Sequence, residues 1–529
     1  MNKGLFILTI LIAFLGRDCI AQVKYTKEQK YLKKEADYIF GFGDYPTAKA
    51  KYLELFAIDS LSVELNHKIA VCILLAEHDR KESKPYFEFA SGKGYIESDY
   101  YIAGLYHLEN NFDRAAEYFR KYLASTEKKQ HDYTTVRKKL DMVERARKMI
   151  ASPVEVRLEN IGPTINTKYH EYVPVISADE SVLIFTSRRP GSTGGKLDPF
   201  GRYYEDIYIS VKQEGKWSRP EGISPNINTD NYDACVGLSS DGFTLIIYKT
   251  NEDYTGGDLY WTTLDGDEWQ VAEKYGEGIN SANLEPSASL SADGNKIYFS
   301  SNRPGGYGGL DIYRAVKFPD GKWSLPQNLG PAINTEAHED APFIHPDDKT
   351  LYFSSQAHET MGGYDIFKSE VDENGAWSKP KNLGYPINTT DDDRYFVLSA
   401  DGRKGYYSSG KDGGFGEHDI YEMHLPHEFK DLTLVKGVIS ADNSTKQALK
   451  AKITLRDAET KKIVGIYHSN SKTGKYLLVI PPDEKLKMTV YAGGYDGYSE
   501  TLFFHDEEGF NKVIKDIKLK PLVTWIKGN

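Results

Sequence analysis

A segment of about fifty residues recurs five times between Glu155 and Leu425, and this repetition constrains the fold more than any other feature of the chain. Each copy contains four short apolar runs separated by glycine, proline, asparagine and aspartate. Four strands per repeat at this period are typical of one blade of a β-propeller. The sequence therefore predicts a five-bladed β-propeller, a fold that holds other molecules on its surface.

A short motif, Ile-Asn followed by Thr or Ser, marks the phase of the repeat. It occurs at residues 165–167, 227–229, 279–281, 333–335 and 387–389. The first interval is longer because residues 191–205 form a loop insertion. The fifth copy ends without its outer strand, whereas residues 156–161 form an unpaired outer strand before the first copy. We expect these two pieces to pair, which closes the ring and removes its exposed edges.

Residues 26–151 are expected to be helical, with repeats close to the tetratricopeptide period. Three pairs with i, i+4 spacing mark the second helices, and their first members are 35 and 32 residues apart. These pairs are Ala48 and Tyr52, Ser83 and Phe87, and Ala115 and Phe119. Residues 133–150 are predicted to form a capping helix. A plain helical bundle is the alternative.

The pattern changes again from Leu434, where strand-like runs alternate with Thr473-Gly474 and residues 481–483 as turns. A small β-sandwich is expected here. The complete division is a signal peptide over 1–21, a tetratricopeptide-like helical domain over 22–152, the propeller over 153–428 and the sandwich over 429–529. The fold class is therefore multidomain α and β.

The first residues have the pattern of a secretory signal: Lys3, an apolar segment and then small residues up to Ala21. The alternative is a lipoprotein in which Cys19 is the acceptor. We predict an exported protein, periplasmic or associated with the outer membrane, without a transmembrane span in the mature chain. Cys72 and Cys235 fall in different predicted domains, so each is expected to be a buried thiol.

The repeats resemble the PD40, or WD40-like, repeats of TolB-type propellers, through motifs such as residues 291–294 and 302–306. The last segment resembles a carboxypeptidase regulatory-like domain, through residues 436–438 and 473–476. In this order the three parts resemble PorE-type proteins of Bacteroidetes type IX secretion. Such proteins continue into an OmpA-type domain, which is not found here, so peptidoglycan binding is not carried over.

Five carboxylates are placed six residues before the same position of each repeat, at the entrance to the innermost strand. They are Glu171, Asp233, Glu285, Glu339 and Asp393. One hypothesis is a ring at the mouth of the central channel that attracts a cation or a cationic peptide. The alternative, which we favour, is structural: each carboxylate accepts backbone N–H groups and joins adjacent blades. A second set, Asp206, Asp258, Asp311, Asp365 and Asp419, is expected to fix the glycine-rich hairpins.

The loops that carry Arg189, Tyr254, Arg303 and Tyr307 are candidates for contacts on the propeller face, because arginine and tyrosine often anchor interfaces. Solvated turn residues are the alternative. His418, His424 and His427 are interpreted as surface histidines, so no metal site is predicted.

The motifs of metalloproteases, nucleophile elbows and P-loops were sought and not found, and no cofactor is predicted. The net charge is −11, and the sequence contains no stripe of basic residues. Both observations disfavour nucleic-acid binding. We predict a non-enzymatic scaffold or adaptor of the cell envelope whose partners are envelope proteins, with secretion components among those that the resemblance implies. Alternatives are a glycan- or peptide-binding module that uses the propeller face, and a hydrolase.

Overall fold

The computed structural model describes residues 23–76, 80–125, 130–198, 201–251, 256–411, 413–426, 432–505 and 510–522. Two compact units divide the chain. The first comprises residues up to Leu105 together with 125–130, and the second comprises residues 106–124 and 131 onward. The predicted signal and Cys19 lie outside the described residues, as do Tyr254 and His427. The predicted boundary at residue 152 differs from this division, because the last two helices group with the sheets.

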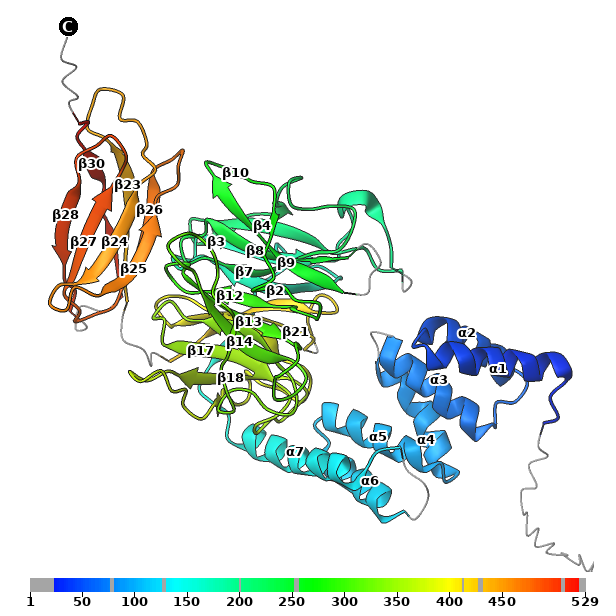
Figure 1. Ribbon diagram of the computed structural model, residues 1–529. Helices are drawn as coiled ribbons and strands as arrows, with labels where there is room; N and C mark the ends of the chain where they lie inside the picture. Colours follow the sequence, from blue (N-terminus) through cyan, green and yellow to red (C-terminus); the bar gives the residue numbers. More distant parts are fainter. Residues whose placement is uncertain are drawn as a thin grey trace, which may run out of the picture. The chain divides into compact units, whose positions relative to one another are not determined.

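The described part of the region 26–151 is helical, as predicted, and is coloured blue to cyan in Figure 1. Its α-helices are α1 (Lys27–Gly41), α2 (Tyr45–Phe56), α3 (Val63–Ala76), α4 (Lys84–Gly92), α5 (Ile96–Leu108), α6 (Phe112–Ala124) and α7 (Tyr133–Ala151), with a 3₁₀ turn at Arg80–Ser83. The helix starts follow local chemistry. Thr26 forms a capping box with Gln29, and Asp44 accepts from the backbone N–H of Thr47.

The small-and-aromatic pairs that predicted the second helices are all buried. Ala48 and Tyr52 lie on α2, in a core with Leu55, Leu65 and Ile69. On α6, in the other unit, Ala115 and Phe119 are also buried. Alanine at these positions lets the neighbouring helix approach, and the aromatic ring fills the space beside it.

Successive antiparallel sheets follow the helices (Figure 1), each with the innermost strand first. The first sheet contains β2 (Glu171–Ile176), β3 (Val182–Ser187), β4 (Asp206–Gln213), β5 (Lys216–Trp217) and β6 (Glu221–Gly222). The second contains β7 (Asp233–Leu238), β8 (Thr244–Thr250), β9 (Gly257–Asp265), β10 (Glu268–Trp269) and β11 (Glu273–Lys274). The third contains β12 (Ala288–Leu290), β13 (Lys296–Ser301), β14 (Asp311–Val316) and β15 (Gln327–Asn328).

The fourth sheet contains β16 (Glu339–Ile344), β17 (Thr350–Ser355), β18 (Asp365–Glu370) and β19 (Lys381–Asn382). The closing sheet contains β20 (Arg394–Leu398), β21 (Lys404–Ser409), β22 (Asp419–His424) and, as its outer strand, β1 (Arg157–Asn160). Leu158 of β1 is paired with Met423 of β22, which confirms the predicted closure by the strand that precedes the first repeat. Antiparallel sheets that close on themselves in this way form a β-propeller.

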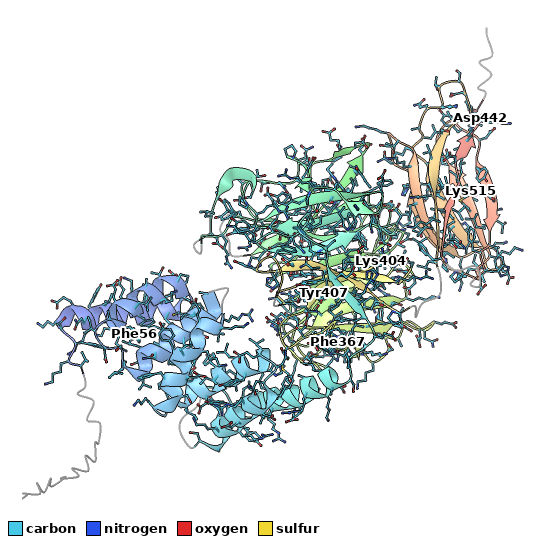
Figure 2. The ribbon with its side chains drawn as sticks, turned by 180° about the vertical axis from the view of Figure 1, so that it is seen from behind. Phe56, Phe367, Lys404, Tyr407, Asp442 and Lys515 are labelled. Carbon is cyan, nitrogen blue, oxygen red and sulfur yellow. The ribbon has the colours of Figure 1, made fainter. Side chains whose placement is uncertain are left out.

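Apolar side chains from the facing sheets fill the spaces between them (Figure 2). Tyr407 of the closing sheet packs in a cluster with Tyr352 and Ile366 of the fourth sheet. Phe367 of the fourth sheet packs with Ile312 of the third. Strands inside these sheets therefore bury large residues on both faces, which accounts for the continuous apolar pattern of β3, β13 and β17.

The segment after Leu432 forms two further sheets around a single core that includes Val435, Ile453 and Leu478. One sheet contains β26 (Lys475–Ile480), β23 (Thr433–Ala441), β29 (Asn511–Ile514) and β30 (Ile517–Leu519). The other contains β25 (Ile463–His468), β24 (Lys452–Asp457), β27 (Leu486–Tyr491) and β28 (Tyr498–Leu502). The strand-like runs predicted from Leu434 onward are confirmed as strands, among them β23, β24, β26 and β27.

Within the second unit, the end of α5, α6 and α7 dock on loops of the propeller. His107 Nε2 lies 2.8 Å from the carbonyl oxygen of Met361, and Arg145 donates to the carbonyl of Thr360 at 2.9 Å. Burial lowers the pKa of His107 to about 4, so its imidazole is neutral near pH 7. No described helix is long and apolar enough to cross a membrane.

Candidate functional site

The five carboxylates are placed at the entrance to the innermost strand of each sheet, as predicted. Glu171, Asp233 and Glu339 are the first residues of β2, β7 and β16, and Asp393 precedes β20 by one residue. Glu285 lies three residues before β12. None of the five is more than 1% exposed. Carboxylates this deeply buried must be satisfied by protein groups or by an enclosed ligand.

The glutamates bind back to the Ile-Asn-Thr motif. Glu339 accepts from the backbone N–H of Thr335 at 2.7 Å and from the Thr335 hydroxyl at 2.8 Å. The hydroxyl of Ser355 donates to the same carboxylate at 2.7 Å. Glu171 and Glu285 have the same partners at the matching positions of their sheets. The Thr or Ser of the motif therefore connects the start of one sheet to the loop that precedes that sheet, which is called the joint below.

A basic residue completes the network in the first three sheets, and its type follows the acid. Beside Glu171 and Glu285, Arg189 and Arg303 donate to the acid and to the carbonyl of the isoleucine in the motif. Beside the shorter Asp233, Lys249 donates to the carboxylate and to the Ile227 carbonyl, both at 2.6 Å. A lysine can reach an acid that is one methylene shorter, because its ammonium group is not held in a planar fork.

The other two sheets vary this scheme. In the closing sheet, Lys411 donates to the carbonyl of Pro386 at 2.9 Å, and its charge faces Asp393. In the fourth sheet, His358 takes the place of the basic residue, and its Nε2 lies 3.0 Å from the carbonyl of Ile333. The sequence analysis did not assign roles to Lys249, Lys411 and His358. Each lies near the end of the second strand of its sheet, and this shared position could have predicted their pairing with the acids.

Burial and hydrogen bonding act in opposite directions on these acids. Desolvation raises the pKa of Glu171 and of Glu339, while the bonds from Thr, Ser and the nearby cation lower it. Burial also raises the pKa of Asp393, which Lys411 opposes. Each of the five acids accepts hydrogen bonds from the motif that precedes its sheet, which favours the structural role, and the buried Asp393 Oδ1 is the one oxygen of the set without a partner among the described residues.

The cavity along the innermost strands is separate from these acids. It encloses about 30 Å³ and is lined by apolar and small residues such as Val175, Gly237 and Phe343. None of the five carboxylates belongs to its described lining. The lining of this cavity therefore gives no support to the hypothesis of a cation-attracting ring.

The asparagine of the Ile-Asn-Thr motif has a role that the sequence analysis missed. Asn334 accepts from the backbone N–H of Ile312 at 2.8 Å and donates to the carbonyl of the same residue at 3.0 Å. The Asn334 side chain therefore pairs with the third strand of the preceding sheet as a neighbouring strand would. The next residue, Thr335, binds the following sheet. Asn166, Asn228, Asn280 and Asn388 form the same pair of bonds.

The second set of aspartates fixes the hairpins in three sheets. Asp311 accepts from the backbone N–H groups of Tyr307 and Gly308, and Asn328 donates to it at 2.7 Å. Asp365 and Asp419 have equivalent partners. Asp206 holds the insertion through Thr193. Asp258 departs from the set among the described residues, since it accepts a hydrogen bond from Lys274 at 2.7 Å.

The candidate face contacts divide into two kinds. Arg189 and Arg303 are largely buried in the joints described above, and the Arg303 guanidinium lies 5.0 Å from the centre of the Phe299 ring. They are therefore structural and not exposed anchors. Tyr307 is 51% exposed at its hairpin tip and is open to a partner. Tyr254 lies outside the described residues.

The histidines and cysteines hold no metal site among the described residues. His418 is half-buried beside His170, with 2.9 Å between their Nδ1 atoms, so the interpretation as a surface histidine does not fit this residue. His424 is partly exposed on β22. Cys72 and Cys235 are free and buried, as predicted.

A buried ion pair joins neighbouring innermost strands and was not predicted. Arg394 donates to Asp340, which also accepts from the hydroxyl of Ser300 at 2.7 Å. The Arg394 guanidinium lies over the rings of Tyr364 and Tyr395, at 4.4 and 4.8 Å from their centres. The pair connects residues of the third, fourth and closing sheets.

Comparisons with known proteins identify no family. No family model matches the chain, and no curated protein matches it. Among solved structures, TolB from Acinetobacter baumannii is 15% identical over 56% of this chain and 72% of its own, with a TM-score of 0.32. An α-L-arabinofuranosidase from Lactobacillus brevis is 13% identical over 51% of this chain and 98% of its own, at 0.33. A gluconolactonase from Xanthomonas campestris is 12% identical over 52% and 92%, at 0.30. Likeness at these TM-scores carries no argument about function.

Proposed function

We propose that the chain is a non-enzymatic adaptor of the bacterial cell envelope, exported and held at or near the outer membrane by protein partners. Its proposed parts are the signal peptide (1–21), tetratricopeptide-like repeats (22–152), a five-bladed PD40 propeller (153–428) and a carboxypeptidase regulatory-like β-sandwich (429–529). Type IX secretion is the proposed context. The five sheets of the repeat region and the two sheets after Leu432 support this division.

The observation that carries the proposal is the use of the repeated polar residues. The acids of the repeat, the basic residues beside them and the asparagines of the motif all bond within or between sheets. The most regular motifs of the sequence therefore build a rigid support. Reactive groups in an active site instead keep a donor, an acceptor or a nucleophilic atom free for the substrate.

The first unit offers a surface suited to a protein partner. On α1 and at its C-cap, three aromatic side chains are largely exposed: Tyr31 and Tyr38 of the helix and Phe42 at the cap, at 71%, 67% and 73%. The rings of Tyr38 and Phe42 are in edge-to-face contact, with 4.7 Å between their centres. Exposed aromatic residues that cluster on one helix are typical anchors of protein interfaces.

A full-length double variant, Tyr38→Ser with Phe42→Ser, tests the proposal in cells. Both residues are exposed, so folding should be retained, whereas capture of envelope proteins and sedimentation with the outer membrane should fall. Tyr491→Ser is the matched control, because Tyr491 is 65% exposed on the C-terminal sheets. Release of the truncated protein that lacks residues 25–150 into the soluble periplasm is the second expected result.

Two results would overturn the adaptor proposal. One is unchanged membrane association of both the double variant and the truncated protein. The other is turnover of a substrate by the purified full-length protein, which would favour the hydrolase alternative. Binding of a purified glycan with no change on loss of α1 would favour the glycan-binding alternative.

A further inference from the structure

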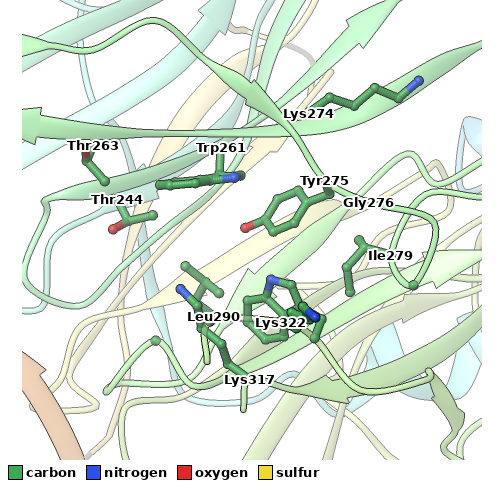
Figure 3. A pocket seen from close by; sticks show the side chains of 14 residues that line it. Thr244, Trp261, Thr263, Lys274, Tyr275, Gly276, Ile279, Leu290, Lys317 and Lys322 are labelled. Atoms are coloured by element: carbon green, nitrogen blue, oxygen red, sulfur yellow. The ribbon is translucent and has the colours of Figure 1, made fainter. Parts of the chain in front are cut away.

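A pocket of about 470 Å³ lies between the second and third sheets. Trp261 and Tyr275 contribute to it from the second sheet, and Lys317 and Trp323 contribute from the third. Figure 3 shows Trp261 and Tyr275 in the same view as Lys317 and Lys322, with Leu290 beside them. This volume lies in the range of small-ligand sites. No role was assigned to it in the sequence analysis.

Lys317 has an unusual setting in this pocket. It is paired with Trp323 across two neighbouring strand segments, and its ammonium group lies 5.6 Å from the centre of that ring and 5.9 Å from the ring of Trp261. The Lys317 side chain as a whole is exposed, while partial enclosure of its ammonium group beside the two rings lowers the pKa of that group. Among the described residues, no carboxylate is recorded within salt-bridge distance of it. A cation in this state gains most from an anionic ligand.

An equivalent lysine elsewhere in the propeller shows what is missing. Lys212 is paired with Trp217 in the first sheet, as Lys317 is with Trp323, and its ammonium group lies 4.9 Å from that ring. However, Lys212 also bonds to Glu180 at 3.3 Å. The pocket around Lys212 is lined by four acids, namely Glu159, Asp179, Glu180 and Glu422. That pocket neutralises its own lysine.

The Lys317 pocket contains no such acids. In the described residues its lining has no aspartate or glutamate, while Lys274 and Lys322 add positive charge. Lys274 is paired with Asp258 outside the lining, and the exposed Lys322 lies 3.9 Å from Asp320, so Lys317 is the lysine of the described lining without a paired acid. Burial, and after it the charges of Lys452, Lys450 and Lys317, lower the pKa of His468 at the C-terminal sheets. In a chain with a net charge of −11, this is a local reversal of sign.

Apolar side chains lie next in sequence to the pocket residues. Phe318 follows Lys317 and is 51% exposed, and Leu325, two residues after Trp323, is 86% exposed. Saccharide sites need carboxylate, amide or guanidinium groups for pairs of hydroxyls, and the described lining has none of these. Aromatic and aliphatic surface beside uncompensated lysine instead matches apolar and acidic side chains of a polypeptide.

We propose that this pocket binds an acidic segment of a partner protein, which inserts one aromatic or aliphatic side chain and places a carboxylate against Lys317. The inference deepens the proposed adaptor function and depends on it only for the identification of the ligand as a protein. The aromatic surface supplies burial, and the lysine selects for negative charge.

Synthetic peptides test the proposal with the full-length protein. The probe is a fluorescein-labelled pentapeptide amide with phenylalanine flanked on each side by two glutamates, titrated by fluorescence anisotropy. Matched probes replace the glutamates by lysine, or the phenylalanine by alanine, and both should bind at least about tenfold more weakly. Affinity for the first probe should fall as salt rises, because screening at 0.1 M acts beyond about 10 Å.

Two variants locate the site. Lys317→Gln keeps most of the stem and removes the charge, and we expect the dissociation constant to rise at least about tenfold, or 1.4 kcal/mol. Lys212→Gln is the control at the equivalent position and should leave the dissociation constant within about twofold, because Glu180 already occupies that lysine. Thermal melting checks that both variants fold.

Three outcomes would overturn the proposal. They are no binding of the glutamate probe at about 1 mM, equal binding by Lys317→Gln, and tighter binding of polygalacturonate than of the peptide, which would assign the pocket to an acidic saccharide. Failure here is distinct from failure of the adaptor function. If the peptide fails while the Tyr38 and Phe42 variant still loses its partners, only the pocket inference falls.

Discussion

Replacement of Asn166 by alanine is the most direct test of how the propeller is closed. The Asn166 side chain accepts from the backbone N–H of Ile420 at 2.9 Å, and it donates to the Ile420 carbonyl at 2.9 Å and to Asn160 at 2.8 Å. It therefore connects the start of the repeat region to β22, which is 254 residues away. Asn334 forms the same three bonds at an internal joint, with Ile312 and Asn328.

The magnitude follows from the groups left behind. Ile420 is fully buried, and its N–H has no other recorded partner once Asn166 is truncated, whereas its carbonyl keeps the backbone N–H of Ile161 at 3.2 Å. One unsatisfied buried donor costs about 1–3 kcal/mol, and the weaker carbonyl adds about 1 kcal/mol. We expect Asn166→Ala and Asn334→Ala each to lower the free energy of unfolding by about 2–4 kcal/mol.

The two variants should nevertheless differ in where the protein opens. At the internal joint the third and fourth strands belong to one continuous hairpin, whereas β1 is held to β22 only by noncovalent pairing. Hydrogen–deuterium exchange should therefore show lost protection across β1 and β20–β22 in Asn166→Ala. In Asn334→Ala the loss should stay near β14 and β16.

The reasoning is refuted if Asn166→Ala unfolds at the same urea concentration as the unsubstituted protein. It is also refuted if protection of β1 is unchanged while that of the internal sheets falls, since closure would then not depend on this joint.

Three further predictions concern the buried acids, the helices that contact the propeller and the innermost strands. Glu339→Gln should lower the free energy of unfolding by about 1–3 kcal/mol, and calcium should not change the melting temperature of either form; a calcium-dependent rise that the variant loses would contradict the structural role. Because burial lowers the folded pKa of His107 to about 4, the stability that its buried neutral imidazole contributes is complete above the unfolded value near 6.5 and is lost as pH falls toward 4. Docking of α6 and α7 should weaken by about 2 kcal/mol between pH 7 and 5, visible as faster exchange in these helices, and His107→Gln should show no such change. Gly237→Ala should destabilise the propeller by at least about 2 kcal/mol in urea unfolding, because a Cβ there would lie 2.5 Å from a backbone carbonyl of the third sheet, whereas Gly276→Ala, with open space around it, should be neutral.

The periodic features of the sequence predicted much of the architecture. Apolar runs of strand length, separated by turn residues, depend only on local spacing, so the strand order and the outer position of β1 could be read directly. The aspartates of the hairpins could be assigned for the same reason, since Asp311 binds the N–H groups of residues three and four positions before it. Interactions this short in sequence are determined by local chain geometry.

The positions of the five carboxylates could be predicted from the sequence, but their burial and their partners could not. The repeat placed Glu285 and Glu339 at the strand entrance, yet their exposure depends on side chains that arrive from another strand or from the preceding joint. Arg303 was a candidate surface anchor because arginine often anchors interfaces, and only the folded structure shows that it binds Glu285. Burial is a property of the packed sheets and has no local signal.

The innermost strands show most clearly what tertiary structure decided. Val173, Ala341 and Tyr395 occupy the same position in three sheets, and all have positive φ values, of 50°, 50° and 59°. Each lies at an irregularity in the strand pairing, a β-bulge that bends the strand beside the central cavity. Valine and tyrosine disfavour this conformation by about 1–3 kcal/mol, so no propensity in the sequence predicts it. Closure of several twisted sheets around one axis imposes the bend, and the packing of the whole ring offsets its cost.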